Sequence, residues 1–397
     1  MTTTDSITAQ IGRWQRTSLL VGAAGVLVGI VAFLVDREQF LRSYLFAYLY
    51  WTGMGLGCLA ILLMHHVVGG KWGMLIRRLC EAGARTLPFM ALLLIPILLG
   101  ITTLYLWARP EAVHDANIQS KAAYLNVPFF IGRTVFYFAV WFLYSYLLSK
   151  WSAAQDRAGL DHLSNERLIA KMRALSAPGL VVFTLTTTFA FIDWIMSLEP
   201  HWFSTVYGAM FMIGEMLESF AFVIALLIIL SKMSPLKEYT TRQHIHDLGN
   251  LMFAFMVLWA YLSFSQFLII WAGNLPEEIP WYISRLRGDW GWVALTIVIF
   301  HFAVPFALLL FRGVKRREDR LFRVCLLMIL IRLVDVYWIT EPAFYGQHLR
   351  VHWMDFMTPL AVGGLWLAVF FWRLNSRPLV PVGDPRLQGA PRETVAF

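Results

Sequence analysis

Charged residues are scarce in this chain of 397 residues. Asp, Glu, Lys and Arg together make up 15% of it, whereas a soluble domain carries roughly 25%. Hydrophobic residues reach 58%, and the mean hydropathy is +0.61. This composition excludes a water-soluble enzyme, because so much apolar surface cannot be hidden in a soluble core of ordinary size. It also excludes a disordered chain, which would need low hydrophobicity.

Cysteine is also rare, with only Cys58, Cys80 and Cys325, and these form no CxxC or CxxCH motif. A disulfide scaffold needs many more cysteines, an iron–sulfur cluster normally needs four thiolates, and a c-type haem needs CxxCH. We therefore expect this chain to bind no redox cofactor and no metal of its own.

Long apolar stretches dominate what the sequence does contain. Each is long enough to cross a bilayer as a helix, which takes about 20 residues. They predict an all-α polytopic membrane protein with about ten transmembrane helices, at residues 17–35, 43–64, 86–107, 127–148, 176–198, 204–231, 247–271, 290–312, 320–340 and 355–374. The connecting segments, of which 108–126 and 149–175 are the longest, leave no room for a soluble domain.

Lys and Arg are distributed unequally between the two sides of these spans. One side, with both termini, holds 23 of them and the other holds 7. The positive-inside rule then places both termini in the cytoplasm. The net charge of +8 is explained by these loops, so it does not call for a nucleic-acid partner. We expect a multi-pass membrane location, with lipid as the surroundings.

The order of the spans suggests two parallel four-helix units. The expected organisation is an N-terminal segment with the first span (1–42), a first four-helix bundle (43–198), a second four-helix bundle (199–340), the last span (341–374) and an extended cytoplasmic tail (375–397). The tail is rich in proline, which favours an extended arm that lies on a partner.

Ionisable residues within the spans are the best functional indicators, because such residues are costly in a membrane. Arg133 and Asp193 lie at matching depths on neighbouring spans, which predicts an ion pair. Arg332 and Asp335 are three residues apart, which predicts a second pair within one helix. Each of the two could be a purely structural ion pair. Alternatively, Asp193 and Asp335 could take up and release protons.

Other candidates lie at successive depths in the second four-helix bundle. Glu215 and Glu218 share a helix face near mid-membrane, and His301 lies at mid-depth in the eighth span. His246 and Asp247 begin the seventh span. A path from Asp247 and His246, past Glu215, Glu218 and His301, to Asp193 is one interpretation. Each residue also has a structural alternative. A neutral Glu215 or Glu218 could donate a hydrogen bond to a neighbouring helix, His301 could be a buried core histidine, and Asp247 could cap the start of its helix.

Several motifs carry a resemblance to a known family. They lie between residues 180 and 390, in the order FIDWIMSLEPHWFST at 191–205, HDLGN at 246–250, GNLPEE at 273–278 and GDPRL at 383–387. These motifs resemble those of the F-type membrane subunit of bacterial alternative complex III, an NrfD/PsrC-like membrane protein. The first half of the chain matches in topology rather than in motif.

The resemblance implies a ten-helix protein of the bacterial inner membrane, in a respiratory-chain complex that oxidises quinol. It implies as partners a paralogous NrfD-like membrane subunit, an iron–sulfur subunit, multihaem and monohaem c-type cytochromes, and small membrane subunits. Haem c and iron–sulfur clusters would belong to those partners, while quinol or quinone could bind here.

Three functions follow from these observations. The first is a membrane subunit of a quinol:electron-acceptor oxidoreductase, without a redox cofactor and with a candidate proton path. The second is a subunit that itself binds and oxidises quinol. The third is a secondary transporter, against which the spans show few mid-depth Gly or Pro residues in matching positions.

Overall fold

The computed structural model describes residues 3–159, 161–381 and 383–384, and in these ranges the regular structure is entirely helical. The helices of the first half are α1 (Thr3–Val35), α2 (Arg37–Val68), α3 (Met74–Ala84), α4 (Leu87–Leu93), α5 (Ile95–Leu99), α6 (Ile101–Leu104), α7 (Ala116–Ser120), α8 (Val127–Ala158) and α9 (His162–Trp194), with short turns η1 (Leu106–Ala108), η2 (Pro110–His114) and η3 (Met196–Leu198).

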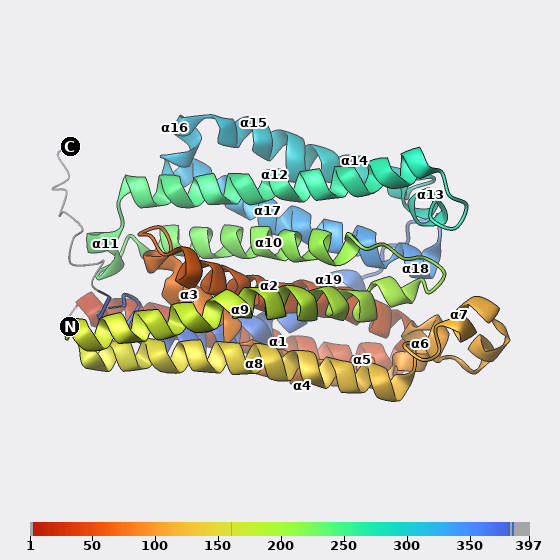
Figure 1. Cartoon of the computed structure of the whole chain (residues 1–397), viewed down its shortest axis with the longest axis horizontal. Helices are drawn as coiled ribbons and strands as arrows, with labels where there is room; N and C mark the ends of the chain where they lie inside the picture. Colours follow the sequence, from red (N-terminus) through yellow and green to blue (C-terminus); the bar gives the residue numbers. More distant parts are fainter. Residues whose placement is uncertain (1–2, 160, 382, 385–397) are drawn as a thin grey trace.

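The second half continues with α10 (Tyr207–Leu230), α11 (Leu236–Tyr239), α12 (Arg242–Gly273), α13 (Pro280–Leu286), α14 (Trp290–Ile297), η4 (Val298–Ala303), α15 (Val304–Leu310), α16 (Arg312–Lys315), α17 (Glu318–Thr340), α18 (Pro342–Tyr345) and α19 (Met354–Asn375). The long helices run side by side along one axis (Figure 1). We call the end with α11 and α16 the inner end, after the cytoplasmic side that the sequence predicts for it, and the end with α7, α13 and α18 the outer end.

Local sequence signals set the helix boundaries. The Asp36 carboxylate caps α2 by accepting a hydrogen bond from the backbone N–H of Gln39, and Asn126 caps α8 in the same way. Thr241 and His244 form a reciprocal capping box at the start of α12. Asn274 ends α12 in a left-handed conformation with φ of 50°, which asparagine tolerates better than most residues.

The fold is that of a multi-pass membrane protein. Nine segments of the described chain are long and apolar enough to cross a bilayer, where the sequence predicts about ten. The remaining one, α17, has 23 residues and is therefore about 35 Å long. It is less apolar than the other nine because it carries Arg320, Arg323, Arg332 and Asp335.

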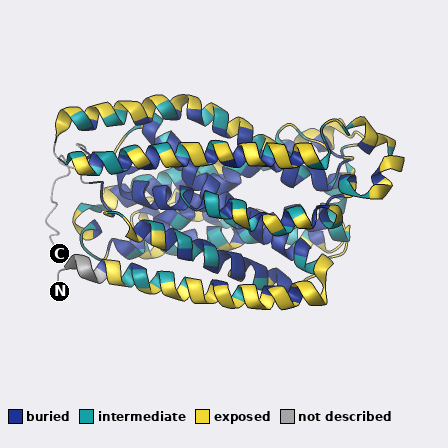
Figure 2. Ribbon diagram, turned by 90° about the horizontal axis from the view of Figure 1, so that it is seen from below, coloured by how far each residue is buried: buried dark blue, intermediate teal, exposed yellow. Residues whose placement is uncertain are grey.

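The centre of the molecule is formed by α2 and α10, which pack against each other. In their most apolar windows 94% and 89% of the residues are buried, against 17% in α1. The peripheral helices bury one face and expose apolar side chains on the other (Figure 2). In a membrane protein such an outer face contacts lipid. Helices α3, α8 and α9 lie on the α2 side, while α12 and α17 lie on the α10 side.

Two predicted boundaries were wrong. The third span does not begin at 86, because the helix starts at Met74 and buries Arg77, Arg78 and Glu81. These charges resembled a cytoplasmic loop, yet inside the protein they pair with one another and with Asp156 and Asp384. The predicted loop 149–175 is mostly helix, because α8 continues to Ala158 and α9 begins at His162.

The beginning of the C-terminal tail lies against the chain itself. Arg377 donates a hydrogen bond to the carbonyl oxygen of Ser149 on α8 (2.8 Å), and Asp384 lies 3.5 Å from Arg77 on α3. The first part of the predicted arm therefore packs against α8 and α3. Residues 385–397, on which the rest of that prediction falls, lie outside the described part of the chain.

Candidate functional site

Five buried ionisable side chains meet where α10, α17 and η4 come together beside α2. They are Glu215 and Glu218 on α10, Arg332 and Asp335 on α17, and His301 in η4, each at most 2% exposed. We call them the central cluster. Arg332 donates a hydrogen bond to Asp335 and lies 3.9 Å from a Glu218 carboxylate oxygen. His301 Nδ1 lies 3.7 Å from Asp335 Oδ2. Four of the predicted proton-path residues are thus brought together around one arginine.

Two glycines allow these side chains to approach. A Cβ atom at Gly53 of α2 would lie 2.8 Å from Glu215 Oε1, and one at Gly214 of α10 would lie 2.6 Å from the guanidinium carbon of Arg332. Both distances are shorter than real Cβ contacts. The missing side chains therefore create the space that the central cluster occupies.

His301 lies on an irregular turn of its helix. The segment η4, Val298–Ala303, is a π-helix between α14 and α15. Pro305 follows, and a proline ring clashes with the carbonyl group four residues earlier, which here belongs to His301. A wider turn relieves that clash, and such π-turns are frequent at functional sites. The His301 ring packs on Trp259 of α12, with ring centroids 3.9 Å apart.

Several polar atoms of the central cluster have no hydrogen-bond partner among the described residues. They include both carboxylate oxygens of Glu215, both of Glu218, and both ring nitrogens of His301. Buried polar atoms are nearly always hydrogen-bonded in proteins, so unsatisfied ones need a functional or solvent explanation. One arginine also faces three carboxyl groups, so a neutral cluster needs two carboxyl protons. This arrangement can hold protons and exchange them.

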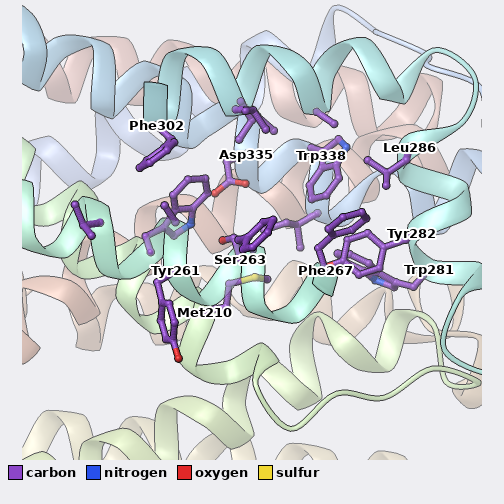
Figure 3. Close-up of a pocket in the computed structure, with 18 residues that line it drawn as sticks. Met210, Tyr261, Ser263, Phe267, Trp281, Tyr282, Leu286, Phe302, Asp335 and Trp338 are labelled. Carbon is purple, nitrogen blue, oxygen red and sulfur yellow. The ribbon is translucent and has the colours of Figure 1, made fainter. Parts of the chain in front are cut away.

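A cavity of about 720 Å³ opens beside the central cluster. Its walls come from α10, α12, α13, α14 and α17, and they are mainly aromatic and apolar. Asp335 points into it opposite Ser263, while Trp281, Tyr282 and Trp338 line its outer part (Figure 3). A large apolar pocket with a few polar groups is the usual form of a small-molecule site.

The remaining predicted residues lie elsewhere. Asp193 is fully buried and accepts hydrogen bonds from Arg133 Nε (2.9 Å), Arg133 Nη2 (2.8 Å) and the Tyr137 hydroxyl (2.8 Å). This pair joins α9 to α8, and within the described ranges no hydrogen bond or ion pair connects it directly to the central cluster. The contact between α9 and α10 near it is aromatic, with Phe191 and Phe211 rings 4.2 Å apart. The direct contact between α9 and α10 at this level is therefore apolar.

The predicted start of the proton path at the inner end is also separate from the central cluster. His246 and Asp247 lie 3.8 Å apart at the start of α12, where Gln243 and Asn250 bind them. The buried side chains that follow on α12 are apolar: Leu248, Met252 and Met256. About 18 Å of helix lies between Asp247 and Trp259 at 1.5 Å per residue. The central cluster is thus a compact site, and the described side chains form no continuous row of ionisable groups between it and Asp247.

Sequence reasoning missed one buried carboxyl group at the outer end. Glu341, at the junction of α17 and α18, is 0% exposed, and neither carboxylate oxygen has a hydrogen-bond partner in the described chain. Burial raises the pKa of Glu341 well above its usual value, and the neighbouring Asp355 raises that pKa further, while Arg42 opposes it. The residue was overlooked because it follows the predicted span by one position.

No three His, Cys, Asp or Glu side chains within the described ranges converge in a way that would hold a metal ion. The chain matches no family model, and no curated protein matches it.

Proposed function

We propose that this chain is a membrane subunit of a quinol:electron-acceptor oxidoreductase of the alternative complex III kind, and that its central cluster exchanges protons. The motifs at 191–205, 246–250, 273–278 and 383–387 support the choice of complex. In this proposal the redox cofactors belong to the partner subunits. The chain itself is not catalytic alone but contributes to proton translocation by the assembly.

The observation that carries the proposal is the arrangement of the central cluster. Glu215, Glu218 and Asp335 surround one guanidinium in the interior of a membrane protein, and most of their oxygen atoms lack partners. Buried carboxyl groups in membrane spans are the usual components of proton relays. Glu218 lies 3.9 Å from Arg332, Asp335 lies 3.7 Å from His301, and Glu215 lies within electrostatic range of Arg332 and Glu218. A proton gained at one of these groups therefore changes the charge felt by the others.

The first test is whether the expected partners exist. The chain should be tagged in its native membrane, extracted in a mild detergent and purified, and the product should be examined by mass spectrometry and by a reduced-minus-oxidised spectrum. We expect c-type haem and an iron–sulfur subunit to co-purify. A colourless chain that purifies without large partners would contradict the proposal.

The second test addresses the proton role in the purified complex. The complex should be placed in lipid vesicles, and the number of protons moved per electron measured with quinol as donor. We expect Glu218→Gln to lower this ratio, because an amide cannot release a proton, while electron transfer in uncoupled vesicles continues. Glu238→Gln is the matched control, since Glu238 is exposed at the inner end, where it accepts a hydrogen bond from Ser234. An unchanged ratio in Glu218→Gln would contradict a proton role.

Quinol binding by this chain is a second candidate function, and the 720 Å³ cavity favours it. The aromatic walls suit a prenylated ring, and Asp335 could accept a hydrogen bond from a quinol hydroxyl group. Ser263→Phe would fill part of the cavity. If quinol binds there, the KM for quinol should rise severalfold in the complex; an unchanged KM would exclude this cavity as the quinol site.

A further inference from the structure

A basic cluster at the inner end is left without enough negative charge. A small depression in the protein surface is lined by Arg78, Arg85, Arg373 and Arg377, with Glu81 as the acidic member. These residues come from α3, from the turn after α3, from the end of α19 and from the first part of the tail. Segments far apart in the sequence therefore bring four arginines together.

The carboxylates near this cluster are already engaged. Glu81 is shared by Arg77 (3.0 Å), Arg78 (2.8 Å) and Arg377 (3.6 Å). Asp156 pairs with Arg78, and Asp384 lies 3.5 Å from Arg77. The available anions are used on the buried side of the depression, against α3 and α8.

Arg85 and Arg373 are the two cations left over. Neither forms an ion pair within the described part of the chain, and the Nε atom of Arg373 is buried without a hydrogen-bond partner. Each also lies within electrostatic range of Arg377, which repels it. Half-buried guanidinium groups that repel one another are costly unless an anion lies between them.

The position of the depression indicates which anion would fit. Arg373 lies two residues before the end of α19 and Arg377 two residues beyond it, at the level where a bilayer has its headgroups. Trp372 beside Arg373 is 51% exposed, and Leu92, one helical segment beyond Arg85, is 61% exposed. An exposed tryptophan next to an arginine is typical of a membrane interface, and the exposed leucine provides apolar surface for acyl chains.

We propose that Arg85, Arg373 and Arg377 bind the phosphate of an anionic phospholipid headgroup at the inner end of the protein. Guanidinium groups match phosphate oxygens with paired hydrogen bonds. Basic pockets between membrane helices on the cytoplasmic side bind such headgroups. The lipid would complete the charge balance between α3, α19 and the tail. This inference does not depend on the proposed oxidoreductase role.

The test compares lipids on the purified protein in mild detergent. Native mass spectrometry would count the phosphatidylglycerol and phosphatidylcholine molecules retained from mixed micelles. We expect phosphatidylglycerol to bind at least tenfold more tightly, and the double variant Arg85→Gln/Arg373→Gln to lose that preference. The matched control is Arg316→Gln/Arg320→Gln, which removes two exposed arginines from the same end and should keep the preference.

Three results of this lipid comparison would overturn the proposal. They are equal binding of the two lipids, an unchanged preference in the Arg85/Arg373 double variant, and inorganic phosphate binding as tightly as the lipid, which would assign the site to free phosphate. If the double variant does not fold, the wild-type protein still provides a test. Raising the salt from about 0.05 M to about 0.5 M should weaken phosphatidylglycerol retention severalfold, since exposed charge interactions are screened. Retention that is independent of salt would also overturn it.

Discussion

The Arg133–Asp193 pair offers a quantitative test of how buried charge holds the first helix bundle together. Asp193 is 0% exposed, and two of its three side-chain hydrogen bonds come from Arg133. In Arg133→Gln the carboxylate would keep only the Tyr137 hydroxyl. Hydrogen bonds to charged groups contribute about 1.5–3 kcal/mol each, and breaking a buried ion pair by removing one partner costs about 3–5 kcal/mol. We therefore expect Arg133→Gln to lower the unfolding free energy by about 3–5 kcal/mol.

The assay is reversible unfolding in mixed micelles, followed by near-UV circular dichroism. Arg317→Gln is the matched control, because Arg317 and Asp319 form a pair at 3.4 Å in which both side chains are more than half exposed. Exposed pairs contribute about 0–1 kcal/mol. The double variant Arg133→Gln/Asp193→Asn should recover at least about 1 kcal/mol of the summed single losses, since it leaves no buried charge.

Two outcomes would refute this reasoning. The first is a loss in Arg133→Gln no larger than that in Arg317→Gln, which would mean that the Asp193 carboxylate does not depend on its partner. The second is strict additivity in the double variant, which would mean that the two residues do not interact. Either result would reduce the pair to an incidental contact between α8 and α9.

Three further predictions concern stability in the same assay. Burial raises the pKa of Glu341, so this side chain keeps its proton in the native state while it ionises near pH 4.5 in the unfolded chain, and the wild type should lose up to about 1.4 kcal/mol of stability per pH unit above that value. Glu341→Gln should therefore be more stable than the wild type at pH 8 and equal to it at pH 4. A stability difference that does not change with pH would contradict this prediction. Gly214→Ala should lower the unfolding free energy by about 1–3 kcal/mol because its Cβ would overlap the Arg332 guanidinium. In the control variant Gly132→Ala the new Cβ meets nothing within 4 Å, so the unfolding free energy should not fall. Equal losses in the two variants would refute the close-approach argument. Asn126→Ala should cost about 0.5–2 kcal/mol because it removes the α8 cap, and Asn117→Ala, at a site where the backbone N–H and not the side chain bonds to Asp115, serves as its control.

The fold was predictable because long apolar runs have few alternatives in a membrane. The prediction failed where charges are buried. The first part of the third span contains Arg77, Arg78 and Glu81, which hydropathy assigns to a loop. Only the structure reveals that Gln155 and Ser152 on α8 bind these side chains. Glu81 balances only one of the two arginines, and the other acids that pair with them, Asp156 and Asp384, are distant in the sequence. No local pattern can reveal that part of the charge balance.

The candidate site was predictable in its residues but not in its shape. Glu215, Glu218, His301 and Asp335 could be selected because ionisable groups in spans are rare. Their convergence on Arg332 required knowing that Gly214 faces that side chain. The adjoining cavity could not be foreseen at all. Its aromatic lining comes from α12, α13, η4 and α17, and each of those residues taken alone is typical of an interfacial belt or a packed core.

The predicted path from Glu218 to Asp193 shows what a depth argument leaves out. Counting residues along a span gives the height of a side chain in the membrane, and by height both Asp193 and Asp335 belong to the outer half. Height does not determine which helix a side chain faces. Asp193 faces α8, where it meets Arg133, while Asp335 faces the cavity beside α12. Between them stands the aromatic contact of Phe191 with Phe211, which offers no group that could accept a proton. Asp335 lines the cavity, so a proton that leaves the cluster on this side should be released more slowly in Ser263→Phe even if no quinol binds there; an unchanged rate of release would exclude this route.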